Sequence, residues 1–376
     1  MSSTVSPMAD VKVLETAADL SALREEWEEL ASRCPEHRLS QRYRWAAVAW
    51  RTVAAPRGRR LHILTLRSGG RLVGVWALVS HLDKGLRVVR QLGAESSEYT
   101  EPLVEPGPHQ GEWFERLWKA VRPLGDLLFM PHVRSDSPLA RLTGRFCLRC
   151  FVDNELNAPQ ILRAAYPDWE AYLATVTTSH RSNLRRKRRR LSDLGKVTFR
   201  REVTPVDPAT IDAILAHKQA WIERRGYHNE WLAQREYRDF LCAMTSDPQA
   251  PGSLCLFLLC VDDTPVAFQI DAVDDRRIEG LIGCQDPAWG RYSTGELLLQ
   301  DSLQWAFQHN RDIDFRIGDE SYKSAWARLD CLTFNCLVGL SLRGMAVVWL
   351  RKIAKGLQTL RFRLGLGRLR HVLRRR

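Results

Sequence analysis

The most informative part of the sequence is the stretch Ile313-Asp314-Phe315-Arg316-Ile317-Gly318-Asp319-Glu320-Ser321-Tyr322-Lys323-Ser324-Ala325-Trp326. An apolar segment with strand character ends in a glycine, and two carboxylates, a phenol and an ammonium group follow within five residues. Catalytic groups are often placed at such strand ends, where a rigid scaffold meets a loop. A solvated turn with a weak Asp319–Lys323 surface pair explains the same residues. From the residues alone, both interpretations stay open.

A second stretch, Arg291-Tyr292-Ser293-Thr294-Gly295-Glu296-Leu297-Leu298-Leu299, leaves a predicted strand and begins a predicted helix. Ser293 or Thr294 can cap this helix, and Gly295 allows a ligand to approach the backbone closely. The N–H groups and dipole at a helix start favour an anion such as a pyrophosphate. An ordinary capped helix is the alternative.

The order of predicted elements repeats along the chain. The first series contains a strand near Val13, helices at 18–31 and 45–50, strands at 61–66, 72–79 and 87–92, a helix at 113–121, a strand at 126–130 and a helix from Ser137. The second contains helices at 168–175, 179–194, 208–225 and 230–244, strands at 197–202, 254–261, 265–273 and 277–283, a helix at 295–308, and strands at 312–317 and 332–342. This pattern predicts a duplicated, mixed α/β fold with domains 10–157 and 158–342.

The length and composition fit a folded protein of two domains. The 376 residues are 45% apolar and 27% charged, which excludes wholesale disorder. The N-terminus lacks the features of a secretory signal, and no apolar run reaches about 18 residues, so we expect a cytoplasmic chain. The odd number of cysteines, nine, fits a reduced compartment. Cys147 and Cys150 lie close together but lack the second pair of a zinc site.

The net charge of +12 is concentrated at the C-terminus, where residues 339–376 contain eleven Lys and Arg and no acid. Apolar residues recur there at helical spacing, at Leu350, Ile353, Leu357, Leu360 and Leu364. The tail 343–376 therefore predicts a basic amphipathic helix suited to peripheral contact with an anionic membrane. Glycines at 356, 365 and 367 weaken the helix and leave a disordered tail open.

A second basic cluster, Arg181–Arg190, contains seven Lys or Arg, while Leu184, Leu191 and Leu194 give it an apolar stripe. A solvated helix face explains it, and so does attraction for a polyanionic cofactor or an anionic acceptor. Few aromatics interleave with the arginines, which argues against nucleic acid as the partner.

Several of these stretches together resemble one family. The run Asp314–Lys323 is similar to the Asp-Phe-x-x-Gly-Asp-Glu-x-Tyr-Lys signature of the CelD-like, FemAB-related acyltransferases of the GNAT superfamily. Arg181–Leu191 resembles the arginine-rich helix of that family, and His217-Lys218-Gln219-Ala220-Trp221 its His-x-x-x-Trp helix. Asp286 with Tyr292-Ser293-Thr294-Gly295 resembles its Asp-x-x-x-x-x-Tyr-Ser-Pro-Gly loop, except that Thr294 replaces the proline. Leu72–Leu78 and Gln91–Tyr99 extend the resemblance over residues 10–340.

The resemblance implies two tandem GNAT-like (acyl-CoA N-acyltransferase) domains, with the site mainly in the second. It implies acetyl-CoA or another acyl-CoA as co-substrate and no metal. The residues expected to bind that cofactor are Arg291, Tyr292, Ser293, Thr294 and Gly295. Backbone donors in Val266–Val273 are expected to polarise the thioester carbonyl, and the expected substrate-binding residues are Trp221, Gln269 and Asp286.

Acyl transfer also needs acid–base groups. The candidate catalytic residues are Asp319, which is our first choice of base, Glu320, Tyr322, Lys323 and His217. Lys323 is also a candidate for holding a phosphate or an acceptor carboxylate. A single histidine on a helix that carries Trp221 also fits a packed or surface histidine.

Three functions are compatible with the sequence. The leading one is an acyl-CoA-dependent N- or O-acyltransferase that modifies a polysaccharide, an envelope glycan or its precursor. A Fem-type transferase that uses aminoacyl-tRNA is the second, and a noncatalytic scaffold that binds nucleic acid or membrane is the third. The acyl chain, the acceptor and the oligomeric state stay open.

Overall fold

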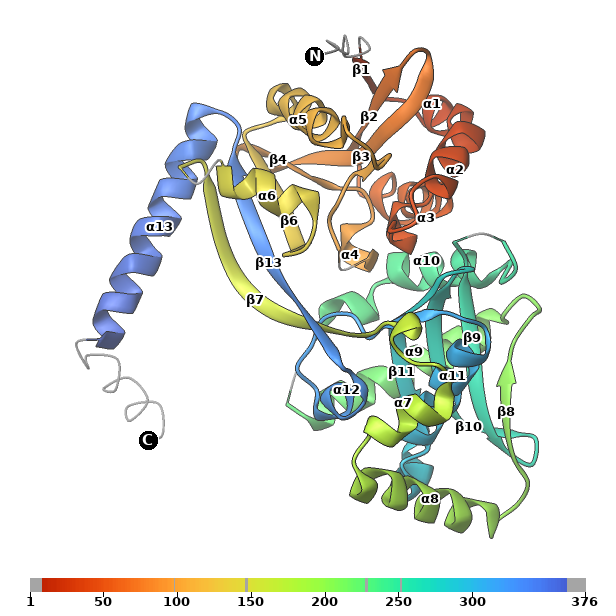
Figure 1. Cartoon of the computed structure of the whole chain (residues 1–376). Coiled ribbons are helices and arrows are strands. Elements are labelled where there is room, and N and C mark those ends of the chain that lie inside the picture. Colours follow the sequence, from red (N-terminus) through yellow and green to blue (C-terminus); the bar gives the residue numbers. More distant parts are fainter. Residues whose placement is uncertain (1–8, 98, 146–147, 227–228, 251, 364–376) are drawn as a thin grey trace.

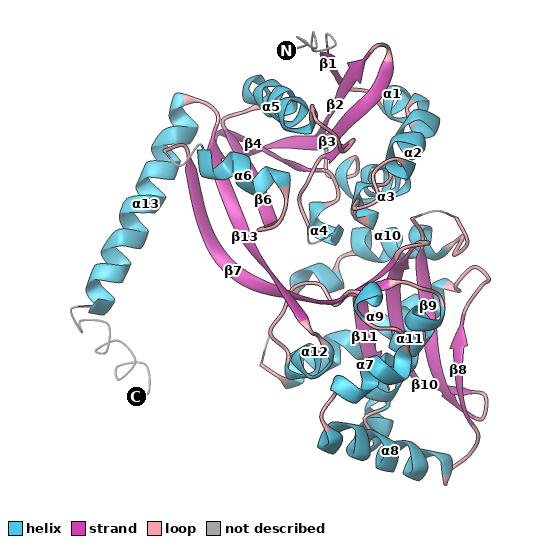
Figure 2. Cartoon of the chain, in the orientation of Figure 1, coloured by secondary structure: helices cyan, strands magenta, loops and turns pink. Residues whose placement is uncertain are grey.

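A computed structural model describes residues 9–363, apart from residues 98, 146–147, 227–228 and 251. Within this part of the chain, thirteen strands form one mixed sheet that runs through two halves of the molecule (Figures 1 and 2). Helices cover both faces of the sheet. None of the described helices is long and apolar enough to cross a bilayer.

The first half begins with an antiparallel meander followed by a parallel strand. Its strands are β1 (Ala9–Leu14), β2 (Arg60–Ser68), β3 (Arg71–Asp83), β4 (Leu86–Gln91), the short β5 (Leu103–Val104) beside β3, and β6 (Leu127–Arg134), which is parallel to β4. Its helices are α1 (Ala17–Ala22), α2 (Arg24–Ser32), α3 (Tyr43–Ala49) with a π-turn η2 (Trp50–Ala54), α4 (Ala94–Ser97), α5 (Gln110–Val121) and α6 (Pro138–Arg145). Thr16 and Asp19 form a capping box at α1, and Leu20, Trp27 and Leu30 are buried as the 3–4 residue spacing predicts.

The second half repeats this order. Its strands are β8 (Val197–Arg201), β9 (Leu254–Val261), β10 (Thr264–Val273), β11 (Arg277–Gln285) and β12 (Asp312–Asp314), which is parallel to β11. Its helical elements are α7 (Trp169–Thr175), α8 (Thr178–Ser192), α9 (Pro208–Arg224), η5 (Glu230–Ala233), α10 (Arg235–Thr245), η6 (Pro287–Tyr292), α11 (Thr294–Gln308) and α12 (Ser321–Trp326). The two parallel pairs, β4 with β6 and β11 with β12, occupy equivalent places, which confirms the predicted duplicated α/β order.

The two halves exchange their last strands. β7 (Cys150–Ile161) follows the first half but pairs with β12, and β13 (Leu329–Gly339) follows the second half but pairs with β6. β7 and β13 also pair with each other, antiparallel, and form the long curved ribbon between the halves in Figure 1. The domain boundary at residues 157 and 158 stays a prediction, and β7 runs through it.

The hydrophobic core also joins the halves. One cluster contains Trp27 and Trp45 from α2 and α3 together with Ile211 and Phe240 from α9 and α10. The Trp45 and Phe240 rings meet edge to face, with centroids 5.1 Å apart. A second cluster on the other face of the sheet packs α7, α8 and α11 against β9 and β10.

Three local expectations were wrong. The strand predicted at 312–317 ends at Asp314, because Arg316 adopts a left-handed backbone with φ 57°. The helix predicted at 230–244 is divided into η5 and α10. Leu194 is exposed because α8 ends at Ser192.

The predicted tail helix is present as α13 (Leu342–Arg363), which continues through Gly356. The rest of the tail, residues 364–376, lies outside the described residues, as do Glu98 and Cys147.

Candidate active site

The candidate site is built around the C-terminal end of β11, where it separates from β12. The parallel ladder joins Arg277–Glu279 to Asp312–Asp314, and β11 then continues alone on that side as far as Gln285. A bulge follows the last ladder pair. Ile270 of β10 pairs with Ile282, whereas Asp271 pairs with Gly280, so Leu281 is the extra residue on β11. Bulges interrupt ladder hydrogen bonding and are common beside active sites.

The turn after β11 fixes the start of α11 against the end of that strand. The Gln285 side chain accepts a hydrogen bond from the Gly295 N–H at 2.9 Å. Thr294 donates its hydroxyl to the Val266 carbonyl at 3.1 Å, and Ser293 adopts a left-handed backbone with φ 51°. Ser293 occupies the N-cap position, as predicted, but neither the Ser293 nor the Thr294 hydroxyl caps the helix, because the side-chain oxygen that accepts from Gly295 belongs to Gln285. Sequence spacing could not identify Gln285, since its role depends on where β11 ends.

The basic helix α8 lies against the start of α11. Lys187 donates to the Ser293 hydroxyl at 2.6 Å and lies 3.7 Å from the Glu296 carboxylate. His180 lies 3.5 Å from the same carboxylate, and Arg188 contacts Asp301 at 2.6 Å. The cationic face of α8 therefore adds positive charge next to the N-terminal dipole of α11, and both favour an anion.

Arg291 lies on the same turn, with its guanidinium 4.7 Å from the centre of the Tyr292 ring. Asp286 precedes it and accepts a hydrogen bond from the Ala288 N–H at 2.9 Å, which caps η6. Both residues thus lie in the short segment that joins β11 to α11. The carboxylate of Asp286 stabilises the turn itself.

A buried polar group on β10 borders the bulge. Gln269 donates to Asp271 at 2.5 Å and to the Ser302 hydroxyl of α11 at 3.1 Å. Burial raises the pKa of Asp271 to about 7, although hydrogen bonds from Gln269 and from the Leu281 N–H favour its charged form. Sequence analysis selected Gln269 and missed Asp271. The sequence does contain a signal for Asp271, because it is an acid in the strand Val266–Val273, whose other residues apart from Gln269 are apolar.

The predicted catalytic run lies just after β12. Lys323 is buried, and its ammonium group donates to the Ile317 carbonyl at 2.5 Å and lies 3.1 Å from the Glu320 carboxylate. Gly318 has φ 134°, and a Cβ at that position would collide with Glu320. Lys323 therefore fixes the loop, on which Asp319 is exposed, and Tyr322 is exposed in the first turn of α12.

The two predicted residues of α9 lie on the other side of β11. The His217 ring stacks on Phe268, with centroids 5.9 Å apart, as a packed histidine would. Trp221 has Lys218 at 4.4 Å and Arg225 at 4.0 Å from its ring centre. Lys218 also donates to the Gly283 carbonyl of β11 at 3.1 Å, so this part of α9 contacts the end of β11 that extends beyond the β12 ladder.

A cluster of charged side chains joins the two halves beneath this region. Asp314 is buried and accepts hydrogen bonds from the Tyr99 hydroxyl at 2.8 Å and from Arg38 at 3.1 Å. Gln160 donates to it at 3.2 Å and Arg134 at 3.5 Å. Asp314 and Tyr99 both belong to the stretches with family resemblance, yet no local pattern indicated that they meet. We call these five residues the Asp314 cluster.

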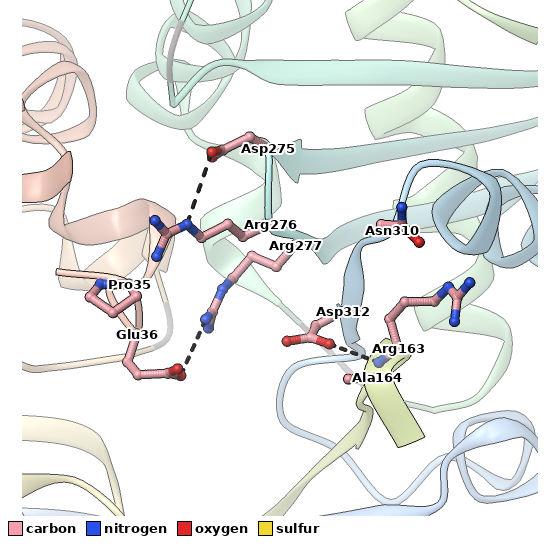
Figure 3. A pocket seen from close by; sticks show the side chains of 9 residues that line it. All are labelled: Pro35, Glu36, Arg163, Ala164, Asp275, Arg276, Arg277, Asn310 and Asp312. Atoms are coloured by element: carbon pink, nitrogen blue, oxygen red, sulfur yellow. Dashed lines mark hydrogen bonds and ion pairs between the residues drawn. The ribbon is translucent and has the colours of Figure 1, made fainter. Parts of the chain in front are cut away.

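A separate pocket of about 450 Å³ lies at the opposite end of β11 and β12 (Figure 3). Its charges are largely matched within the pocket. Arg277 lies 3.6 Å from Glu36 and Arg276 lies 3.9 Å from Asp275. The backbone N–H of Arg163 donates to Asp312 at 2.8 Å, while its guanidinium donates to the Phe307 and Tyr166 carbonyls. This pocket contains none of the predicted site residues.

Comparison with known protein families matches one continuous part of the chain. Residues 178–324 match the acetyltransferase (GNAT) domain. This span includes the basic helix α8, the bulged strand β11, the turn into α11 and the run up to Lys323. Among curated protein sequences, none matches the chain.

Solved structures share the fold over most of the chain. FemX is 12% identical over 82% of this chain and 95% of its own, with a TM-score of 0.58. The C-terminal domain of a putative lysylphosphatidylglycerol synthetase from Agrobacterium fabrum is 12% identical over 88% and 95%, with a TM-score of 0.52. L-PGS from Bacillus licheniformis is 13% identical over 86% and 96%, also with a TM-score of 0.52. At these identities the likeness concerns the fold, and the predicted fold class of two GNAT-like units is confirmed.

Proposed function

We propose that this chain is an acyl-CoA-dependent N- or O-acyltransferase with its site at the C-terminal end of β11. One observation carries the proposal: Lys187 of the basic helix binds Ser293 at the start of α11, directly after a bulged strand that has left its neighbour. This arrangement combines a cationic helix start with the last part of β11, whose backbone groups are not hydrogen-bonded to β12. An acyl-CoA has complementary parts, namely a pyrophosphate and an amide-rich pantetheine arm that ends in a thioester.

The side chains around β11 fit such a substrate. A Cβ at Gly283 would meet nothing within 4 Å, so the sheet face is open above that residue, although its carbonyl accepts a hydrogen bond from Lys218. Lys187, Arg291 and the N-terminus of α11 supply positive charge for the phosphates. The bulge at Leu281 supplies irregular backbone at the level where the thioester would lie. Trp221 and Gln269 stay proposed contacts of the acceptor or the acyl group.

The reaction forms a bond between the acceptor nitrogen or oxygen and the thioester carbonyl carbon, and it breaks the carbon–sulfur bond. The acceptor proton passes to a base, and the sulfur leaves as a thiolate that takes up a proton. We propose Asp319 as the base, with Glu320 and His217 as alternatives, and Tyr322 as the proton donor to the thiolate. Lys323 acts as a positioning residue, because its ammonium holds the loop that carries Asp319.

We further propose that the acceptor is a polysaccharide, an envelope glycan or a precursor of one, and that the enzyme acts in the cytoplasm. The support is the resemblance of Asp314–Lys323 and its companion stretches to the CelD-like acyltransferases. The acceptor class is therefore less directly supported than the acyl donor.

The test is a calorimetric titration of the full chain with acetyl-, succinyl- and long-chain acyl-CoA. We expect saturable binding of at least one of them, and a raised melting temperature in its presence. Lys187→Ala should weaken binding about tenfold, because a charge-assisted contact is lost. Arg190→Ala is the matched control, since Arg190 is an exposed cation on the same helix. Gly295→Trp should abolish binding while the protein stays folded.

Three results would contradict the proposal. If the Lys187→Ala and Arg190→Ala variants bound acyl-CoA with equal affinity, the cofactor would not bind at the start of α11. The absence of binding to every acyl-CoA would favour the Fem-type, aminoacyl-tRNA-dependent alternative, for which the exposed arginines of α8 offer a surface. If Asp319→Ala and Lys323→Ala variants retained full biological activity, a noncatalytic scaffold would be favoured.

A further inference from the structure

The helix α13 exposes a continuous apolar stripe along its length. With 3.6 residues per turn, the residues of this stripe fall within an arc of about 100° around the helix axis. Their exposed fractions are 84% for Leu342, 46% for Trp349, 66% for Leu350, 55% for Ile353 and 54% for Leu357. In an α-helix this spacing places them on one face. Isolated exposed apolar residues are ordinary, but a stripe of large ones marks an interaction surface.

The opposite face of α13 attaches the helix to the body. Val348 is fully buried in a small cluster with Leu127, Phe151 and Leu337. Further along, Lys352 donates to the Leu148 carbonyl at 3.4 Å and Lys355 to the Val152 carbonyl at 3.0 Å. These contacts fix the rotation of the helix about its axis, so the apolar stripe faces away from the sheet. The helix itself lies at the side of the molecule (Figure 1).

The charge of the tail indicates what covers the stripe. Residues 339–376 contain eleven Lys and Arg and no acid, and Arg343 and Arg351 are exposed beside the stripe. A second copy of this chain would bring two acid-free cationic segments together, which is unfavourable. An anionic bilayer matches both features, because its headgroups attract the cations and its acyl boundary accepts Leu, Ile and Trp.

We propose that α13 docks on the surface of an anionic lipid bilayer, with its axis in the plane of the membrane and the Leu342–Leu357 stripe buried. Lys and Arg near such a surface each contribute to the attraction, and long cationic side chains reach the headgroups while their stems stay apolar. Trp349 is suited to the interface, because its ring is apolar and its N–H is polar. The proposal stands apart from the acyltransferase site, since no residue of that site is used.

The test is co-sedimentation of the full chain with vesicles of phosphatidylcholine alone or of phosphatidylcholine with about 30% of the anionic lipid phosphatidylglycerol. We expect binding to the anionic vesicles only, with weakening between about 0.1 and 0.5 M salt because the charges are screened. The double variant Leu350→Ser/Ile353→Ser should bind at least about tenfold more weakly, because two buried apolar side chains are lost. Leu82→Ser removes an equally exposed leucine from β3 and is the control.

Equal binding to neutral and anionic vesicles, or unchanged binding of the double variant, would overturn the proposal. So would a lack of vesicle binding combined with a concentration-dependent dimer that disappears in the double variant, because the stripe would then be a contact between copies. Circular dichroism of each variant checks that the fold is intact, which is expected because both substituted positions are exposed.

Discussion

At the scale of single residues, we expect the substitution of Asp314 to lower the stability of the protein strongly. Its buried carboxylate depends on Tyr99, Arg38, Gln160 and Arg134, which come from both halves of the chain. Asp314→Asn would leave the largely buried Arg38 without the carboxylate that it contacts, while Arg134 keeps its ion pair with Asp136 at 2.7 Å. We expect the free energy of unfolding to fall by about 3–5 kcal/mol, as for other broken buried pairs.

Urea denaturation of the Asp314→Asn variant measures this loss. Tyr99→Phe is the matched variant, because it removes one hydrogen bond from the same cluster and keeps the charges. It should lower the free energy of unfolding by about 1 kcal/mol. Equal effects of the two variants would mean that the charges in the Asp314 cluster contribute little.

The buried Asp271 predicts how stability depends on pH. Its pKa is raised to about 7 by burial, above the value of an aspartate in the unfolded chain. Between about pH 4 and pH 7 the folded state therefore binds more protons than the unfolded state, and this group lowers stability as the pH rises. We expect Asp271→Asn to unfold at a higher temperature than the wild type at pH 8 and at a similar temperature at pH 5. Melting curves at both pH values test this, and a variant less stable at pH 8 would contradict it.

The residues of the candidate site could be predicted from the sequence only in part. The turn Tyr292–Gly295 and the run ending in Lys323 stand out in the sequence, because polar and glycine residues interrupt apolar segments there. Their partners did not stand out. Asp271, Gln285 and Tyr99 reach their positions through strand register and through contacts between halves, and neither leaves a short-range pattern.

At the scale of elements, the junction between β11 and α11 depends on one side chain. Gln285 caps the Gly295 N–H, and Thr294 lies against the same oxygen at 3.3 Å. Gln285→Ala removes this cap, so we expect a loss of about 1 kcal/mol in the free energy of unfolding. We also expect weaker acyl-CoA binding, because the helix start is then less well ordered. Denaturation and calorimetry measure the two effects, and Gln249→Ala at an exposed turn is a control expected to change neither.

Most helices and strands followed from periodicity, because each has one apolar face. The exceptions have a common physical cause. β12 ends early because Arg316 turns into a left-handed conformation, and its side chain is buried 3.4 Å from Glu279. Such a conformation is set by tertiary contacts, so a local pattern could not reveal it.

At the scale of the whole molecule, the exchange of β7 and β13 makes the halves interdependent. A chain that ends at Trp326 lacks β13 and leaves the edges of β6 and β7 unpaired, and exposed edges promote aggregation. We expect this truncated chain to be insoluble or to lack a cooperative unfolding transition. A chain that ends at Gly356 keeps β13 and the buried Val348, and it should unfold like the full chain. Gel filtration and thermal unfolding distinguish the two, and a soluble, cooperative 1–326 chain would contradict this view.

The duplicated order of elements was predictable, since each half repeats the same sequence of periodicities. The exchange of strands was not. β13 looks like an ordinary apolar strand, and nothing local in its sequence specifies that β6, about two hundred residues earlier, is one of its neighbours.

The exchange also sets the order of events during synthesis. β6 emerges from the ribosome early, but its partner β13 is among the last strands to be made. At the usual rate of elongation, the gap between them corresponds to roughly 10–40 s. During that time the nascent first half carries an open sheet edge, which makes it a natural client for a chaperone that shields unpaired strands.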